Sequence, residues 1–445
     1  MAPRNILIVM ADQLTPFMVG CYGNKAVKTP HMDALAAQGV RFDAAYSNSP
    51  LCTPGRYAFM TGQYISRFGG WDNAAYLPST VPTFAHYLRL MGYRTGLAGK
   101  MHFVGSDQLH GFEERHTTDV YPADFGWVPD WRTPEKRIDL WYHNMSSVVQ
   151  AGPASITNQL AYDDEVGAAT LRAIYDAVRT EDERPFCYVA SFIHPHDPYA
   201  ARPSYWDLYD DADIPMPQSP RPKATDNDPH SLRLEHAIAL DAVDIDDADI
   251  RRARRAYMAN VSYVDDWLGK LRAALVETGQ ADDTAILLVS DHGDMLGERG
   301  LWYKMTFREW ACRIPMVLHV PGRAGQGVSI ANPVSQVDVT PTLLQLAHEA
   351  TGTPIPDAID PLDGTSLLQF VDGTTQRDTT VAEYTAEGTG QAMLMLRDGP
   401  WKYICCPGDP DQLFDLASDP NEEINLADAA EQAPRMAGFR ARAQA

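Results

Sequence analysis

A cysteine stands in a short pattern, Cys52-Thr53-Pro54-Gly55-Arg56, whose residue types and spacing suit anion chemistry. The pattern lies between a run of apolar and small residues and a stretch typical of a helix, so we expect a helix to begin near Arg56. The amides and dipole at such a helix N-terminus would favour an anion beside Cys52, in a loop that exposes the thiol. The alternative is a cysteine buried in a turn as a small apolar residue.

Ionisable side chains also follow four apolar runs that are typical of buried parallel strands. They are Asp12 after residues 5–10, Lys100 and His102 after residues 93–98, His194 and His196 after residues 185–192, and Asp291 and His292 after residues 284–290. Each could be structural, because aspartate often caps turns and histidine often packs in cores. The carboxyl ends of parallel strands nevertheless meet at one edge of an open sheet, where ligands bind. We therefore expect these residues to lie together with Cys52, and a loop at residues 301–304 to bring Lys304 to the same edge.

Helical patterns alternate with these strands along the chain. Helices are expected at residues 29–35, 82–91, 162–178 and 250–278, and further strands begin at residue 39 and span residues 314–320. This alternation predicts an α/β fold with a doubly wound mixed sheet sandwiched by helices.

The predicted domains are a catalytic domain at residues 1–374 and a small C-terminal α+β subdomain at residues 375–445. Two stretches without a regular period, at about 103–156 and 200–246, are interpreted as loop insertions that cover the site. The subdomain is expected to hold short antiparallel strands, including residues 392–396 and 401–405, and a closing helix.

Composition limits the classes of partner. Lysine and arginine number 37 against 59 aspartates and glutamates, and the net charge of −22 argues against nucleic acid or an anionic membrane. Any anion site must therefore be a local concentration of basic groups. The N-terminus lacks a signal-peptide layout, no apolar run is long enough for a membrane span, and the 6 cysteines show neither a disulfide nor a zinc spacing. These features favour the cytoplasm.

The pattern at Cys52 resembles the signature of the type I sulfatases, a family with the alkaline-phosphatase-like fold. The resemblance extends from the first strand to residues 413–422, which look like the family's C-terminal signature. It implies that Cys52 is oxidised to formylglycine, whose hydrate is a geminal diol. One hydroxyl would attack sulfur and expel the alcohol, and the other would collapse to the aldehyde and release sulfate.

This chemistry needs a divalent metal, and the ligands expected here are Asp12, Asp291 and His292 with the modified Cys52. Calcium is the first choice, with manganese and magnesium open. Gln13 stands where many sulfatases carry a second aspartate, so the identity of the metal is left open.

The other catalytic roles follow the same resemblance. Arg56 would orient the diol, while two lysines would hold the sulfate and stabilise the departing oxygen. Two histidines would transfer protons, and the second is His196 or its neighbour His194. The expected catalytic set is Cys52, Arg56, Lys100, His102, His196 and Lys304.

Within the family, the runs at residues 99–102, 110–115, 121–127, 141–144 and 290–302 are similar to the choline sulfatases. By that resemblance Trp127 would face a quaternary ammonium, Glu387 would supply its countercharge and Asn73 would lie near the substrate. The alternatives are lid packing for Trp127 and a solvated loop charge for Glu387. Choline sulfatases continue with a tail that helps complete a neighbouring subunit's pocket, whereas this sequence stops at Ala445. A homo-oligomer is expected. The missing tail is interpreted either as a truncation of the sequence or as a sign of a more open pocket whose natural substrate is not choline-O-sulfate.

The leading hypothesis is therefore hydrolysis of a small alkyl sulfate, and the first candidate substrate is choline-O-sulfate. One alternative is a phosphonate or phosphate ester hydrolase of the same superfamily. The other is a non-catalytic relative that binds oxyanions and keeps Cys52 unmodified.

Overall fold

The computed structural model describes residues 2–120, 133, 143–323 and 325–444, so Trp127 lies outside the described residues. Its central element is an eight-stranded sheet. Across the sheet the strands are β12 (Val328–Ile330), β2 (Val40–Phe42), β11 (Met316–His319), β9 (Thr284–Ser290), β1 (Asn5–Asp12), β7 (Phe186–Pro195), β4 (Arg94–Gly99) and β5 (Glu114–Arg115). β1 runs parallel to β7 and β9, whereas β11 runs antiparallel to β9. The predicted mixed α/β sheet is confirmed.

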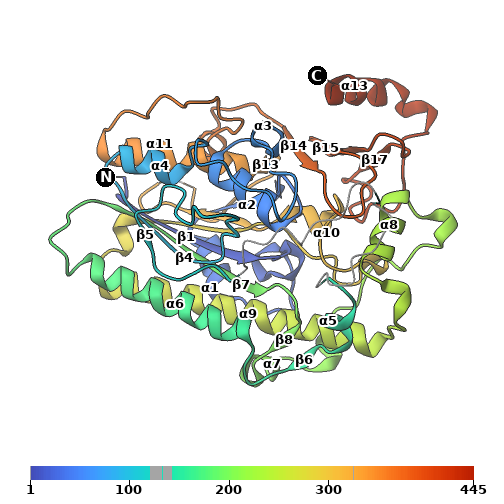
Figure 1. Ribbon diagram of the computed structural model, residues 1–445, viewed down its shortest axis with the longest axis horizontal. Helices are drawn as coiled ribbons and strands as arrows, with labels where there is room; N and C mark the ends of the chain where they lie inside the picture. The colour runs from blue at the N-terminus through green and yellow to red at the C-terminus, as the bar shows by residue number, and fades with distance from the viewer. Residues whose placement is uncertain (1, 121–132, 134–142, 324, 445) are drawn as a thin grey trace.

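Helices cover both faces of this sheet (Figure 1). One face carries α1 (Pro30–Gln38), α6 (Asn158–Ala177) and α9 (Asp247–Glu277), and the other carries α2 (Cys52–Thr61), α4 (Phe84–Leu90) and α11 (Val339–Thr351). Alternate side chains of β1 enter different cores: Leu7 and Val9 pack on the α9 side, and Ile6 and Ile8 on the α11 side. A strand buried on both faces needs an apolar residue at every position, which explains the unbroken apolar run.

The remaining elements are short. The helices are α3 (Ile65–Phe68), α5 (Ser146–Val149), α7 (Pro203–Trp206), α8 (Pro229–Ala237), α10 (Glu309–Cys312) and α12 (Leu367–Val371). The strands are β3 (Ala45–Tyr46), β10 (Arg313–Ile314) and β13 (Val334–Ser335) in one small sheet, and β6 (Gly152–Pro153) with β8 (Ala200–Ala201) in another. Among the described residues, no helix combines the length and apolar character that a membrane crossing needs.

Two expectations about elements were wrong. The helix expected near Arg56 begins at Cys52, because Leu51 is extended and Asn73, distant in sequence, accepts a hydrogen bond from the Thr53 amide. The expected strand at residues 314–320 is two strands in different sheets, β10 and β11, separated at Pro315. Proline has no amide hydrogen to donate to a ladder, so pairing breaks there.

The C-terminal part forms an antiparallel sheet of β14 (Thr379–Tyr384), β15 (Met393–Asp398), β16 (Trp401–Cys405) and β17 (Gln412–Asp415). Helix α13 (Ala433–Gln444) packs against it through Met436 and Phe439, at the end of the molecule marked C in Figure 1.

A buried ion-pair cluster fastens this sheet to the rest of the molecule. Lys402 of β16 is fully buried, and its Nζ lies 3.0 Å from Glu309 Oε1 and 2.8 Å from Glu422 Oε1. Burial opposes the charge of Lys402, but Cys312, Glu309 and Glu422 outweigh burial and raise the pKa of the ammonium group. Glu309 opens α10, directly after the loop that carries Lys304, so the cluster joins the small sheet to the site edge.

We expect Lys402→Met to lower the free energy of unfolding by about 3–5 kcal/mol, because two buried carboxylates lose their cation. The matched control is Lys270→Met, which breaks a half-exposed pair with Asp266 and should cost less than about 1 kcal/mol. Denaturant unfolding of both variants measures the difference. Equal losses in the two variants would show that the buried cluster contributes no more to the free energy of unfolding than a half-exposed ion pair does.

Candidate active site

Cys52 is the first residue of α2 and is fully buried. Its Sγ lies 3.3 Å from His292 Nε2. Burial raises the pKa of the thiol, but the positive charges of Lys100, Lys304 and His292 outweigh burial and hold the pKa well below its usual value. Gly55 lets the helix approach β9, because a Cβ there would lie 3.2 Å from the Asp291 carbonyl oxygen. The chain thus places residue 52 among cationic side chains and at a helix N-terminus, where amides favour negative charge.

Four residues around this position offer donor atoms to a metal ion. Asp12, Cys52, Asp291 and His292 each present one donor, and these atoms lie within 4.8 Å of one another. His292 Nδ1 donates to the Gly293 carbonyl at 3.0 Å, so that Nε2, when the ring is neutral, presents its lone pair to the carboxylates. Asp12 Oδ1 is buried and accepts no hydrogen bond from any described residue. An orphaned carboxylate oxygen beside a second carboxylate and an imidazole lone pair fits a divalent cation.

Arg56 is fully buried and held rigidly between the two acidic strand ends. Its Nε donates to Asp291 Oδ2 at 2.9 Å, and its guanidinium lies 3.2 Å from Asp12 Oδ2. A further hydrogen bond of 2.9 Å reaches Ser191 Oγ within β7. The side chain therefore links the ends of β1 and β9 to β7 and keeps its charge next to residue 52.

The predicted pair Lys100 and His102 follows β4 directly. Lys100 is fully buried and forms an ion pair with Asp12. The His102 amide donates to Asp119 Oδ2 at 2.8 Å, and this contact holds a left-handed backbone (φ 60°). Burial lowers the pKa of His102, although its contact with Cys52 opposes this, so the imidazole is neutral and able to take a proton.

The two candidate histidines after β7 have different surroundings. His194 Nδ1 lies 2.6 Å from Asp163 Oδ2, which also accepts the His194 amide. His196 Nε2 instead lies 2.7 Å from Lys304 Nζ, and its Nδ1 donates to the Asp197 carbonyl at 2.6 Å. The geometry therefore brings His196 to Lys304 and gives His194 a structural contact on α6.

Two predicted substrate residues are linked to this cluster, Asn73 by a hydrogen bond to Thr53 and Glu387 by electrostatic interaction with Lys304. Asn73 is buried; its Oδ1 accepts the Thr53 amide at 3.0 Å, and its Nδ2 has no hydrogen-bond partner among the described residues. Glu387 is buried, Tyr384 donates to its Oε2 at 3.3 Å, and its Oε1 has no hydrogen-bond partner within the described ranges. Both groups hold a polar atom ready for a ligand. Trp127 lies outside the described residues and stays a prediction.

Sequence reasoning assigned no role to several residues that the fold brings here. The His143 ring lies 5.5 Å from that of His196 and 4.8 Å from that of Tyr303. Ser191 and Asp119 hold Arg56 and His102 as described above, and Asp294 accepts a hydrogen bond from Gln13. Asp294 follows Asp291 by three residues, and this closeness in sequence could have indicated that it belongs to the site. The partners of Ser191 and Asp119 are distant in sequence, so no local pattern indicates their roles.

His143, His196 and Asp197 form a second group with converging donor atoms. Both nitrogens of His196 are already engaged, one of them with the ammonium group of Lys304. A cation there would meet Lys304 at close range, so this group suits proton transfer better than metal binding.

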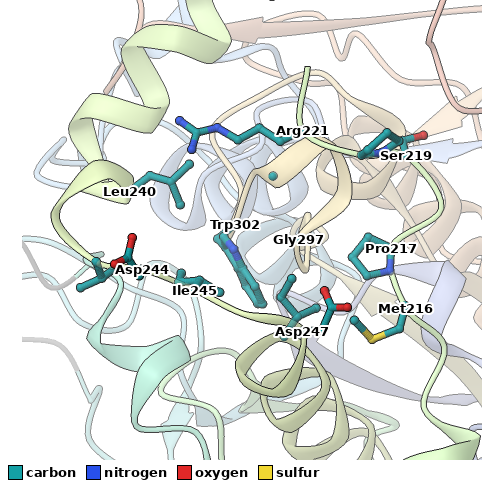
Figure 2. Close-up of a pocket in the computed structure, with 14 residues that line it drawn as sticks. Met216, Pro217, Ser219, Arg221, Leu240, Asp244, Ile245, Asp247, Gly297 and Trp302 are labelled. Atoms are coloured by element: carbon teal, nitrogen blue, oxygen red, sulfur yellow. The ribbon is translucent and has the colours of Figure 1, made fainter. Parts of the chain in front are cut away.

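A cavity of about 550 Å³ opens elsewhere on the surface, as Figure 2 shows. Its lining includes Leu240, Ile245, Pro217 and Trp302, together with the acidic residues Asp244 and Asp247. None of the predicted site residues lines it. The cavity is therefore separate from the Cys52 cluster, although Trp302 precedes Lys304 by two positions.

Two family models together match residues 4–443 of this chain. A family model described as Sulfatase matches residues 4–349, and one described as the C-terminal part of N-sulphoglucosamine sulphohydrolase matches residues 297–443. The chain is 48% identical to the choline-sulfatase of Rhizobium meliloti (strain 1021) over 427 residues, 95% of this chain and 82% of that protein. It is 27% identical to the arylsulfatase of Clostridium perfringens (strain 13 / Type A) over 457 residues, 97% of this chain and 92% of that protein.

Solved structures agree in fold. The phosphonate monoester hydrolase of Agrobacterium radiobacter superposes with a TM-score of 0.79, covering 99% of this chain and 95% of that chain at 24% identity. At this level of identity the likeness concerns the arrangement of strands and helices.

Proposed function

Because this chain belongs to the sulfatase family, we propose that it is an enzyme that hydrolyses a small alkyl sulfate ester, choline-O-sulfate, to the alcohol and sulfate. The observation that carries the proposal is the convergence on residue 52 of a metal-type donor set and two buried lysines. A sulfate ester needs cations around its oxygens, and an alkyl leaving group needs a proton or a cation at the bridging oxygen.

Two groups would add chemistry that the polypeptide lacks. Formylglycine at position 52, as its hydrate, would supply one hydroxyl as nucleophile and a second whose deprotonation releases sulfate. A divalent cation held by Asp12, Asp291, His292 and residue 52 would lower the pKa of the attacking hydroxyl.

The chain's own residues have distinct tasks in this proposal. Arg56 orients the hydroxyls of residue 52, and Lys100 binds a sulfate oxygen beside Asp12. His102, neutral because its pKa is lowered, takes the proton of residue 52. Lys304 and His196, in mutual contact, stabilise the departing oxygen and supply its proton.

Glu387 supports the choline assignment. Its carboxyl group is buried and one oxygen has no hydrogen-bond partner among the described residues, so a cation without donors, such as a quaternary ammonium, would find a countercharge there. Asn73 and Trp127 complete the proposed substrate contacts, Trp127 by stacking its face on the cation.

A substrate panel with a mass measurement tests the proposal. Purified protein should turn over choline-O-sulfate faster than a phosphonate or phosphate monoester, and the peptide with residue 52 should have the mass of formylglycine. Preference for the phosphonate ester would reassign the enzyme within its superfamily. An unmodified cysteine together with tight sulfate binding and no turnover would indicate an oxyanion-binding protein.

We also propose Ca²⁺ as the metal, a cytoplasmic location and a homo-oligomer. The donor set, with two carboxylates, suits a hard cation, and six free thiols suit a reducing compartment. Metal analysis of the purified enzyme, cell fractionation and sedimentation would each decide one of these points.

Glu387 should give substrate selectivity a distinctive pH dependence. Burial raises the pKa of its carboxyl group to about 8, with Asp72 contributing. Below that pH the carboxyl is neutral and must release a proton to bind a cation, so the affinity for choline-O-sulfate should increase up to pH 8 and then level off. We expect the ratio of kcat/KM for choline-O-sulfate to that for an uncharged alkyl sulfate to increase by up to about tenfold per pH unit.

Taking the ratio cancels the titration of groups that serve both substrates. Glu387→Gln is the matched control, because it keeps the shape, removes the charge and should make the ratio independent of pH. A flat ratio in the unaltered enzyme would remove Glu387 from the choline site.

A further inference from the structure

Asp294 is fully buried, and its carboxyl group takes part in none of the ion pairs found among the described residues. Instead it accepts hydrogen bonds on both oxygens, from the Leu296 and Tyr303 amides, from Gln13 and from Tyr199. Once ionised, the Asp294 carboxyl group can only accept, so each of these groups then presents a hydrogen to it. The side chain therefore fixes the orientation of several groups at once.

The Oδ2 atom of Asp294 fixes the amide of Gln13. Gln13 Nε2 donates to it at 2.7 Å, and Tyr199 Oη donates at the same distance. Because the amide nitrogen must face Asp294, the amide oxygen must face away. That oxygen accepts a hydrogen bond of 2.7 Å from Lys304 Nζ. Gln13 Nε2 also donates to Asp197 Oδ1, at the longer distance of 3.4 Å. The polarity of the Gln13–Lys304 contact is thus set mainly by Asp294, through the shorter hydrogen bond.

The Oδ1 atom of Asp294 fixes the backbone next to Lys304. It accepts the Tyr303 amide at 3.0 Å and the Leu296 amide at 3.0 Å. Tyr303 and Met305, on either side of Lys304, both have left-handed backbones, with φ of 66° and 72°. Such conformations are costly for these residues and persist only where surrounding contacts determine them. Asp294 provides one of those contacts.

We propose that Asp294 is the positioning residue for Lys304, acting through the oriented amide of Gln13 and through the Tyr303 backbone. Lys304 then donates one hydrogen to Gln13 and one to His196, and its third is directed by these two towards the departing oxygen. This inference rests on the proposed role of Lys304 at the leaving group.

The test is Asp294→Asn, which keeps the size of the side chain and removes one acceptor. In either orientation, the introduced NH₂ group faces groups that donate hydrogen bonds to Asp294 in the unaltered enzyme. Rotation of the Gln13 amide would remove the donor–donor conflict with Asn at position 294, but it would turn Nε2 towards the ammonium group of Lys304. Lys304 should then leave its position. We expect kcat/KM for an alkyl sulfate to fall by about 100-fold or more, and that for an aryl sulfate with an acidic phenol by less than about tenfold. A series of esters with leaving groups of different pKa measures this dependence.

A double variant provides the rescue. Gln13→Glu with Asp294→Asn preserves the total charge and reverses the polarity of the contact, because the new carboxylate accepts from the introduced amide and from Lys304. The double variant should recover at least about tenfold of the lost alkyl-sulfate activity, although Gln13→Glu alone would set two buried carboxylates against each other. The control is Tyr199→Phe, which removes another donor to Asp294 and should leave the leaving-group dependence unchanged.

Crystal structures of the variants give a readout that does not depend on turnover. Lys304 Nζ should lose its contacts with Gln13 and His196 in Asp294→Asn and regain them in the double variant. Losses that are equal for all leaving groups, or Lys304 unmoved in Asp294→Asn, would overturn the positioning role. If the wild-type enzyme hydrolyses phosphonate esters instead, the proposed function fails, and the same series in that ester class with the crystal structures still decides on Asp294.

Discussion

Cys52→Ala is expected to fold and to lose nearly all activity. The side chain is fully buried and the change removes one atom, so packing is little affected, whereas the precursor of the nucleophile is gone. We expect a loss of at least about 10⁴-fold in kcat, similar to removal of a nucleophile in other covalent mechanisms. Steady-state kinetics measure the loss, and thermal unfolding checks that the variant is folded.

Cys52→Ser separates the formylglycine mechanism from simple nucleophilic catalysis. A single hydroxyl can attack sulfur and expel the alcohol, but it has no second hydroxyl to collapse and release sulfate. We therefore expect a burst of up to one equivalent of alcohol, followed by a stalled enzyme that carries a sulfate ester visible by mass spectrometry. A serine variant with the turnover of the wild type would exclude the diol mechanism.

Asp291→Asn should have the second largest effect. Asp291 Oδ2 accepts from Arg56, and its Oδ1 accepts from the amides of Gln13 and His292, so this carboxylate organises the cluster as well as offering a donor to the metal. Loss of one negative charge weakens a site for a hard cation. We expect metal content and activity to fall together. Activity should fall by more than about 100-fold, which exceeds the usual effect of changing a residue that only contacts a metal ligand. Asp12→Asn should behave in the same way.

Asp163→Asn is the matched control for both metal variants. Asp163 is equally buried and accepts the Ile193 and His194 amides at 2.8 and 2.9 Å, but it belongs to neither group of converging donor atoms. Metal content, measured by elemental analysis after dialysis, should be unchanged in this variant. Retention of a full equivalent of metal by Asp291→Asn would show that the cluster does not bind it.

The sheet and much of the candidate site were accessible from the sequence, because both follow local rules. An unbroken apolar run marks a strand buried on both faces, and the strand's end lies at the edge where ligands bind. Asp12, Lys100 and Asp291 were found in this way, and the structure brings them together around Cys52. Their catalytic and metal roles remain predictions.

Features determined by contacts between distant segments were not accessible. The start of α2 at Cys52 depends on Asn73. Pro315 marks the break in the strand at residues 314–320, but the pairing of β10 and β11 in different sheets depends on strands that are distant in sequence. Gln13 was recognised only as a departure from the family pattern. Its partner Lys304 is 291 positions away, so the pattern did not indicate that the amide serves a lysine.

The complete burial of Cys52 has a consequence for its proposed conversion to formylglycine. In the folded chain the thiol is 0% exposed, enclosed by α2, the ends of β1 and β9 and the Lys304 loop. An enzyme that modifies Cys52 would need to bind several residues around it, and these residues are inaccessible once the segments have packed together. The proposed oxidation would therefore have to happen while the segment is still extended, before these elements pack together. Two rates then compete, that of conversion and that of closure, and a chain that closes first stays trapped as a stable, correctly folded and inactive protein.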